Sequence, residues 1–306
     1  MPAPHVFEAD DLILGKDSLL GSFPRPLLAV LGDPVAHSKS PVFHNAALRA
    51  TGLDAQYVKI HVRPEELPAT LRALPAAGFL GANITIPHKA GALAVVDEAD
   101  DYARKAGAVN TVVVEAGRLA GFNTDGPGLL RAIREEFSAD LRDLRVLLLG
   151  AGGGAGRAIA VQCAMENCRR LVLVNRTADR AARLAAELAP FFQRGPAGRI
   201  LAIPHEDQFL REQLAQTDLV INATSVGMKP ADAPLIPASL LTSSLLVFDT
   251  VYANGKSRLV TDAEAAGARA ANGLSMLLHQ GALSFEIWFN RPAPLEIMRA
   301  ALQSVT

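Results

Sequence analysis

The sequence predicts an α/β fold made of two α/β domains. Three observations support this class. Short apolar runs alternate with segments of helical spacing along most of the chain, as in parallel sheets whose strands are joined by helices. A glycine-rich string at residues 150–155 follows one apolar run and precedes an Ala-rich helical segment. The alternation also restarts near residue 126, and 306 residues are enough for two modest domains.

In the first part of the chain, residues 1–25 lack periodicity and are predicted to be a loosely attached arm. Residues 27–31 form an apolar run that predicts a buried strand, closed by the turn-forming string 32–38. Ser40 and Pro41 then predict the N-cap and the first residue of a helix. The alternation continues with strands predicted at 57–61, 80–86 and 109–114 and helices predicted at 64–73 and 98–106.

The second part of the chain repeats this pattern. Strands are predicted at 144–149, 171–174, 200–203, 219–222 and 246–249, and helices at 128–137, 156–165, 178–188, 274–289 and 295–302. Residues 194–198 predict an exposed loop. We therefore expect a first domain at 1–125, on which residues 273–306 pack again, and a second domain at 126–272.

Composition and charge exclude several classes of protein. Half of the residues are hydrophobic, so the chain can bury a core and is not of the disordered type. The 30 Lys and Arg residues nearly balance the 31 Asp and Glu residues, which gives no electrostatic reason to expect a nucleic acid or an anionic membrane as partner. There is no apolar run of transmembrane length and no signal-peptide pattern, so we expect a cytoplasmic protein.

The two cysteines, Cys163 and Cys168, both fall in a segment predicted to be helical. Five positions apart, they would lie on different helix faces, so we expect no disulfide between them. Their spacing matches no zinc pattern, and we expect no metal site. We interpret both as small buried apolar residues.

The glycine-rich string fits the G-x-G-x-x-G/A fingerprint of dinucleotide-binding turns. The first glycine permits a tight turn, the second lets the backbone approach a pyrophosphate, and the third position must be small for packing of the helix on the strand. The free N–H groups at the helix start would bind the phosphates. The alternative is a merely flexible loop. The residues expected to bind the dinucleotide are Gly150, Ala151, Gly152, Gly153, Gly154 and Ala155.

The residues after the next strand indicate which dinucleotide binds. NAD enzymes usually have an Asp or Glu there, which binds the ribose 2′-hydroxyl. This chain has Asn175, Arg176 and Thr177, followed by Arg180. Because a guanidinium suits a 2′-phosphate, these residues favour NADP. The alternative is that the two arginines form only a solvated helix start.

Two further residues indicate the chemistry. Lys89 ends the string Asn83-Ile-Thr-Ile-Pro-His-Lys89, and Asp125 lies in Gly121-Phe-Asn-Thr-Asp125. Reduction of a ketone needs a hydride donor and a proton source, and a Lys beside a carboxylate can donate that proton or stabilise the developing charge. With the dinucleotide turn, these residues indicate hydride transfer assisted by proton transfer. The alternatives are an ordinary surface Lys and a helix-capping Asp.

These residues lie in strings through which the chain, from about residue 27 to residue 288, resembles the shikimate dehydrogenase family. The strings follow one another in the family's order and approximate spacing. They are Gly32-Asp-Pro-Val-Ala-His-Ser38-Lys-Ser40-Pro41, Ala82-Asn83-Ile-Thr85-Ile-Pro-His-Lys89, Gly107-Ala-Val-Asn110-Thr111, Gly121-Phe-Asn-Thr-Asp125-Gly126, Asn175-Arg176-Thr177, Asn222-Ala-Thr-Ser-Val-Gly227 and Gly273-Leu-Ser-Met276-Leu-Leu-His-Gln280.

The resemblance implies NADP-dependent interconversion of 3-dehydroshikimate and shikimate, a step of chorismate and aromatic amino-acid biosynthesis. It implies that 1–125 with 273–306 is the substrate domain, that 126–272 is a Rossmann-type NADP domain, and that the ligands meet between them. The protein would be a monomer or a homodimer acting on a small molecule.

The resemblance also implies roles for individual residues. Lys89 would be the acid/base at the reacting oxygen, with Asp125 as its close partner. Neutral hydrogen-bonding side chains suit a polyhydroxylated ring acid. The carboxylate of the substrate would be bound by Ser38, Ser40 and Tyr252, and its ring hydroxyls by Asn83, Thr85, Asn110, Asp125 and Gln280. Further cofactor contacts are implied for Thr224, Gly273 and Met276.

The chain departs from the family pattern at two places. The glycine turn has one residue more before Arg157, and Asn254 and Ser257 stand where the family often has Pro and Thr. Two alternative functions remain open. The first is a quinate or quinate/shikimate dehydrogenase, in which we would expect an acid near Arg176 and fewer hydroxyls around Ser38. The second, from a different class of protein, is a non-catalytic dehydrogenase-like regulator.

Overall fold

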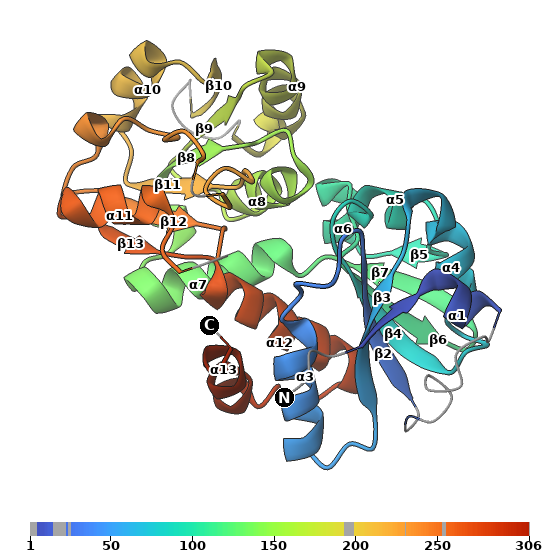
Figure 1. Ribbon diagram of the computed structural model, residues 1–306. Helices are drawn as coiled ribbons and strands as arrows, with labels where there is room; N and C mark the ends of the chain where they lie inside the picture. The colour runs from blue at the N-terminus through green and yellow to red at the C-terminus, as the bar shows by residue number, and fades with distance from the viewer. Residues whose placement is uncertain are drawn as a thin grey trace. The chain divides into compact units, whose positions relative to one another are not determined.

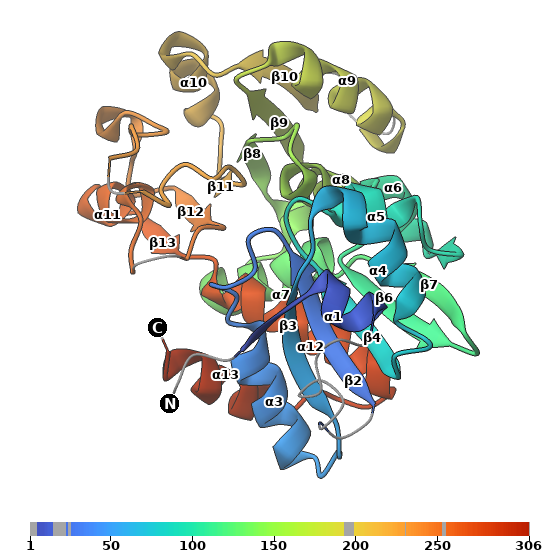
Figure 2. The ribbon, with the colours of Figure 1, turned by 45° about the vertical axis from the view of Figure 1, so that its right-hand side comes forward.

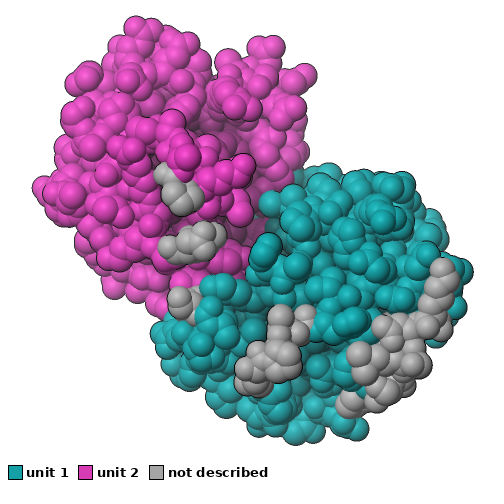
Figure 3. Space-filling model, viewed as in Figure 1, with its two compact units in different colours: residues 1–124, 278–306 teal, residues 125–277 magenta. Residues whose placement is uncertain are grey.

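The computed structural model describes residues 5–14, 23, 26–192, 199–229, 231–252 and 255–305. The chain divides into two compact units (Figure 3): unit 1 comprises Met1–Thr124 and Leu278–Thr306, and unit 2 comprises Asp125–Leu277. Each unit contains one sheet and its own helices (Figure 1), so the predicted α/β class with two α/β parts is confirmed. The loop predicted at 194–198 and the departure at Asn254 lie outside the described residues.

Unit 1 has a seven-stranded sheet in the order β1-β3-β2-β4-β6-β7-β5. The strands are β1 Val6–Glu8, β2 Leu27–Gly32, β3 Gln56–His61, β4 Phe79–Ile84, β5 Glu98–Ala99, β6 Thr111–Glu115 and β7 Arg118–Phe122. Strand β6 runs antiparallel to both of its neighbours, and the other pairs are parallel. Strand β7 was not predicted. A two-residue turn at Ala116 and Gly117, both at positive φ, makes it a hairpin with β6.

Helices of unit 1 cover its sheet and build one core. They are α1 Ala9–Ile13, α3 Ser40–Ala50, α4 Leu67–Ala73, α5 Lys89–Leu93, α6 Asp101–Ala106 and α13 Leu295–Gln303, together with most of α12 Leu274–Phe289. Helix α13 packs beside α3 (Figure 2). Side chains of β2, β3 and β4 such as Leu31, Ile60 and Ile84 meet α4 residues such as Leu71 in the core.

The prediction of a loosely attached arm at 1–25 is wrong for its described part. Strand β1 pairs in parallel with β3, where Glu8 is the partner of His61. Phe7 is 1% exposed and Leu12 of α1 is 6% exposed. A three-residue strand and a five-residue helix are too short to show a periodicity, so burial against the sheet, which the sequence pattern does not report, fixes this segment.

Unit 2 has a six-stranded, fully parallel sheet in the order β10-β9-β8-β11-β12-β13. The strands are β8 Arg145–Leu149, β9 Arg170–Asn175, β10 Ile200–Pro204, β11 Leu219–Asn222, β12 Leu246–Asp249 and β13 Arg269–Ala271, and the helices are α7 Asp125–Phe137, α8 Gly154–Met165, α9 Ala178–Leu188, α10 Asp207–Leu214 and α11 Arg258–Ala265. The order reverses between β8 and β11, which is the switch point of a Rossmann sheet. Strand β13 and helices α10 and α11 were not predicted.

Both cysteines are buried free thiols, as expected. However, Cys168 lies after the end of α8 at Met165, so the prediction that both are helical is wrong for Cys168. Burial raises the pKa of Cys168 to about 12. Within the described residues, no helix is long and apolar enough to cross a membrane.

Candidate active site

In unit 1 the predicted strings meet at one edge of the sheet. Strands β2 and β4 are parallel neighbours, so the loops that follow them lie side by side. The N–H of Thr85 donates to the carbonyl of Leu31 (2.9 Å), and the N–H of Asp33 donates to the carbonyl of Ile86 (3.0 Å). A Cβ atom at Gly32 would collide with Cγ2 of Thr85, so this close approach requires glycine.

The two serines of the first loop lie where it enters α3. Ser40 is the first residue of this helix, one position after the N-cap, so its predicted role as the cap is wrong. Its backbone N–H instead donates to Oγ of Ser38 (3.3 Å). Ser40 is buried and Ser38 is half-buried. The loop therefore brings two hydroxyls together at the N-terminus of an 11-residue helix, where negative groups are stabilised.

A buried hydrogen-bond network surrounds Asn83 at the end of β4. Its Nδ2 donates to Oγ of Ser284 (2.9 Å) and to Oγ1 of Thr111 (3.2 Å), and its Oδ1 accepts from the hydroxyl of Tyr57 (2.8 Å). Burial raises the pKa of Tyr57, so this phenol stays protonated and donates. The Tyr57 ring is stacked on His44 with centroids 4.4 Å apart. The amide of Asn83 is thus held in one orientation.

Asn110 extends the same network from the start of β6. Its Oδ1 accepts from the backbone N–H of Thr124 (2.8 Å), and its Nδ2 donates to Oγ1 of Thr124 (2.9 Å) and to Oε1 of Gln280 (3.4 Å). Ser284, one helical turn beyond Gln280, contacts Asn83 and Thr111. The structure therefore brings Asn83, Asn110 and Gln280 together.

Lys89 lies at the start of α5, directly after the β4 loop, and is half-buried. Its carbonyl accepts from the N–H of Val109 (2.8 Å), next to Asn110. The neighbouring His88 is buried and its Nε2 is bonded to the carbonyl of Val62 (2.6 Å), so it ties the start of α5 to the residue that follows β3. Of the other predicted site residues, Asp125 and Tyr252 belong to unit 2. Asp125 is buried at the start of α7, and burial raises the pKa of Tyr252.

In unit 2 the glycine turn connects β8 to α8. Gly150 has φ +84°, and its N–H and that of Ala151 donate to the carbonyl of Val174 (2.9 and 3.2 Å). A Cβ atom at Gly156 would collide with the carbonyl oxygen of Gly150. We expected Ala155 at this tightly packed third position, and that prediction is wrong. The close contact is made one position further along the helix, at Gly156.

The turn lies against the residues that were predicted to select the cofactor. A Cβ atom at Gly152 would collide with Nδ2 of Asn175 and lie 2.8 Å from Cβ of Arg180, and one at Gly150 would lie 2.7 Å from Cγ2 of Thr224. The N–H of Thr177 donates to Oδ1 of Asn175 (3.1 Å). The absence of a Cβ atom at Gly152 thus lets the turn approach Asn175 and Arg180 closely.

The predicted 2′-phosphate residues are accessible. Arg176, Thr177 and Arg180 are exposed, and neither arginine has an ion-pair partner within the part of the chain that the structure describes. Gly273 packs so closely on Thr250 that a Cβ atom there would collide with its carbonyl oxygen, and Met276 is buried. The residues of unit 2 therefore fit NADP.

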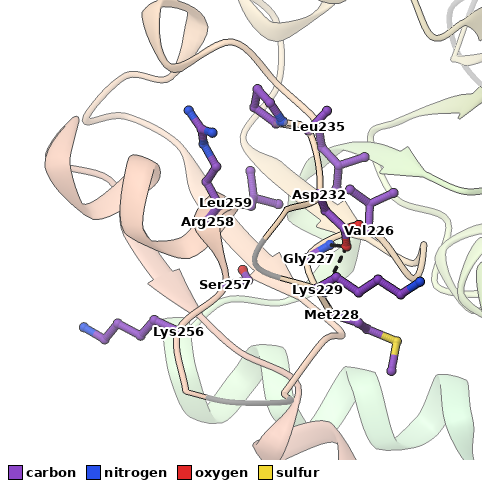
Figure 4. Close-up of a pocket in the computed structure, with 12 residues that line it drawn as sticks. Val226, Gly227, Met228, Lys229, Asp232, Leu235, Lys256, Ser257, Arg258 and Leu259 are labelled. Atoms are coloured by element: carbon purple, nitrogen blue, oxygen red, sulfur yellow. Dashed lines mark hydrogen bonds between the residues drawn. The ribbon is translucent and has the colours of Figure 1, made fainter.

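A separate pocket of about 170 Å³ lies in unit 2 (Figure 4). The carboxylate of Asp232 accepts from the N–H groups of Gly227 (2.8 Å) and Lys229 (3.0 Å) and so shapes one wall. The cationic ends of Lys229, Lys256 and Arg258 extend in different directions rather than into the pocket. None of its lining residues is one predicted to bind substrate or cofactor.

These features define a dinucleotide-dependent dehydrogenase. Unit 2 has a Rossmann sheet with a glycine turn and exposed arginines after β9. Unit 1 carries hydroxyls, amides and a lysine at one edge of its sheet. Comparison with known families specifies it further. Residues 30–112 match the model of the shikimate dehydrogenase substrate binding domain, residues 132–231 match shikimate/quinate 5-dehydrogenase, and residues 273–303 match the shikimate 5′-dehydrogenase C-terminal domain. The chain belongs to the shikimate dehydrogenase family.

Individual relatives are similar over nearly the whole chain. Shikimate dehydrogenase (NADP(+)) of Methanopyrus kandleri is 42% identical over 278 residues, which are 90% of this chain and 94% of the relative. The enzyme of the same name from Symbiobacterium thermophilum is 42% identical over 280 residues, 91% of this chain and 94% of its own. The crystal structure of shikimate 5-dehydrogenase from Thermus thermophilus in complex with NADP(H) and shikimate has a TM-score of 0.80 and 37% identity, covering 92% of this chain and 99% of that one.

Proposed function

We propose that this protein is an NADP-dependent shikimate dehydrogenase, which interconverts 3-dehydroshikimate and shikimate in the biosynthesis of aromatic amino acids. The observation that carries the proposal is the polar edge of the unit 1 sheet, where Asn83, Asn110 and Gln280 form one network beside the loops of Ser38 and Thr85. Neutral donors and acceptors of this kind bind a ring with several hydroxyls. Relatives 42% identical over nine-tenths of the chain carry the same activity in their names.

We assign substrate binding to unit 1 and NADP binding to unit 2. Ser38 and Ser40, with Tyr252, would bind the carboxylate of the substrate, and Asn83, Thr85, Asn110 and Gln280 would bind its ring hydroxyls. The backbone of residues 150–155 would bind the pyrophosphate, and Asn175, Arg176, Thr177 and Arg180 would bind the 2′-phosphorylated ribose. Thr224, Gly273 and Met276 would complete the contacts with the cofactor.

The reaction needs a proton at the oxygen of the substrate. When bound, the reduced cofactor supplies a hydride to the ketone carbon. Lys89 would donate a proton from its ammonium group to the ketone oxygen, and in the reverse direction its amine would remove the proton of the hydroxyl. Asp125 would hold the lysine in position at the reacting oxygen.

The test follows absorbance at 340 nm with purified protein, using shikimate or quinate with NADP or NAD in all four pairings. A clear preference for shikimate with NADP is expected. A preference for quinate or NAD would keep the fold and the chemistry but assign a different substrate or cofactor. No turnover in any pairing would contradict the proposal and favour the non-catalytic regulator.

We also propose a cytoplasmic location, which two buried free thiols support because such thiols are typical of reducing compartments. The assembly stays a prediction: a monomer or a homodimer, which light scattering coupled to size-exclusion chromatography would distinguish.

A further inference from the structure

A buried lysine lies under the loop that leads to Ser38 and Ser40. Lys59 of β3 is 4% exposed, and its Nζ donates to the carbonyl of Ala36 (2.5 Å). No carboxylate pairs with Lys59 among the residues that the structure describes. Removing an ammonium group from water without a counter-ion is unfavourable, and this desolvation lowers the pKa of Lys59. Because no described carboxylate pairs with it, the charge of this ammonium group is not balanced by a neighbouring anion.

The carboxylates nearest along the strands have another partner. His61, two residues after Lys59, contacts Glu8 through Nδ1 (2.8 Å) and Asp33 through Nε2 (3.0 Å). Both hydrogen bonds raise the pKa of His61. The two carboxylates are thus engaged by the imidazole of His61 rather than by the ammonium of Lys59.

Strand pairing places Lys59 on the substrate side of the sheet. Lys59 is the partner of Val30 on β2, and Val30 is the partner of Asn83 on β4. Partners in a parallel sheet point to the same face, and so do residues two apart on one strand. Lys59 therefore shares its face with Asn83 and with Tyr57, whose hydroxyl bonds to Asn83. Strands β2 and β3 run side by side in unit 1 (Figure 2).

The two hydroxyls of the loop that Lys59 supports can bind an anion, but they carry no charge. Ser38 and Ser40 offer neutral donors, and the N-terminus of α3 adds a partial positive charge. A carboxylate carries a full negative charge, which hydroxyls can bind but not balance. The ammonium of Lys59 bonds to this loop at the carbonyl of Ala36, two residues before Ser38.

We propose that Lys59 is a specificity-determining residue for the proposed reaction: its ammonium supplies the positive charge that favours a carboxylate-bearing substrate at Ser38 and Ser40, and its bond to Ala36 holds their loop in place. The inference rests on the proposed function, because it takes the carboxylate of shikimate as the group that is recognised. Lys59 acts on this carboxylate through the loop and through the electric field and does not act as an acid or a base.

The experiment compares shikimate with its uncharged methyl ester. For the wild type, Lys59→Arg, Lys59→Gln and Lys59→Met, the ratio of kcat/KM for shikimate to kcat/KM for methyl shikimate is measured with saturating NADP. The ratio is expected to fall about fivefold to tenfold in Lys59→Gln and Lys59→Met and to stay unchanged in Lys59→Arg. The change should appear as a higher KM for shikimate and not as a lower kcat. Lys105→Gln, which removes an exposed lysine of α6, is the matched control and should keep the ratio.

A role confined to holding the loop would change kcat/KM for both substrates equally, and a constant ratio in Lys59→Gln would therefore overturn the proposal. Thermal unfolding identifies any variant that does not fold; since Gln keeps a donor for Ala36, Lys59→Gln carries the test if Lys59→Met fails. A wild type that oxidises neither substrate would contradict the proposed function itself, whereas an active wild type with an unchanged ratio would contradict only the role of Lys59.

Discussion

Replacing Tyr57 with Phe removes one hydroxyl from the buried network of unit 1 and leaves the aromatic ring in its stack on His44. The hydroxyl donates to Oδ1 of Asn83 over 2.8 Å. A net hydrogen bond contributes about 1 kcal/mol, and a buried acceptor left without its donor costs about 1–3 kcal/mol. We expect the free energy of unfolding to fall by about 1–3 kcal/mol, because little water can replace the hydroxyl at this buried position.

The same change should also weaken substrate binding. Without the donor from Tyr57, the amide of Asn83 keeps the bonds of its Nδ2, whose acceptors include Ser284 and Thr111, but is held less firmly. We expect the less firmly oriented amide to weaken substrate binding by about 1 kcal/mol, which corresponds to roughly a fivefold rise in KM for shikimate. The KM for NADP should not change, since the residues assigned to NADP belong to unit 2.

Urea unfolding and steady-state kinetics of Tyr57→Phe measure both effects. Tyr102→Phe is the matched control, because it removes a hydroxyl from α6, away from Asn83, and should leave KM for shikimate unchanged. Equal stability and equal KM in Tyr57→Phe and the wild type would refute the reasoning that this hydroxyl orients Asn83.

Three further outcomes are expected. Lys89→Ala should lower kcat by roughly 10²-fold to 10⁴-fold with a modest change in KM, and near wild-type turnover would exclude this residue from the chemistry. Arg176→Ala should raise KM for NADP about tenfold or more but leave KM for NAD nearly unchanged, and equal effects on both would contradict the assigned 2′-phosphate contact. Hydrogen bonds to Glu8 and Asp33 raise the pKa of His61, so its stabilising contribution is complete below the unfolded pKa of about 6.5 and is lost as the pH rises through the folded value. The difference in urea midpoint between the wild type and His61→Gln should therefore narrow from about pH 6 to about pH 9, and a difference that widens would contradict this sign.

The sequence predicted those parts of the fold that long apolar runs encode. Strands β2, β8 and β9 are buried on both faces, and uninterrupted apolar residues predict such strands well. Strand β7 was missed because Ala116-Gly117 is not a typical hairpin dipeptide, although both residues adopt positive φ. Strand β13 was missed because its three residues, Arg269–Ala271, have no apolar pattern. They form a strand through their pairing with β12, which the sequence pattern does not show.

The candidate site was predictable where its residues follow strands and unpredictable where they support others. Ser38, Thr85 and Arg176 lie in loops directly after β2, β4 and β9, so the strand pattern alone indicates that they gather at sheet edges. Tyr57 and Lys59 lie inside β3, where an apolar or amphipathic residue is expected to pack. Only the register with β2 and β4 shows that they face Asn83.

The glycine turn shows why a fingerprint does not fix the geometry. The string 150–155 satisfies the G-x-G-x-x-G/A pattern, yet the close contact with Gly150 is made by Gly156. Helix α8 begins at Gly154, so Gly156 lies in its first turn, where a Cβ atom would collide with the carbonyl of Gly150. A pattern match counts positions along the chain, but packing depends on the direction in which each Cα–Cβ bond points. Gly156, which the pattern does not include, therefore preserves the close approach of the helix to the turn.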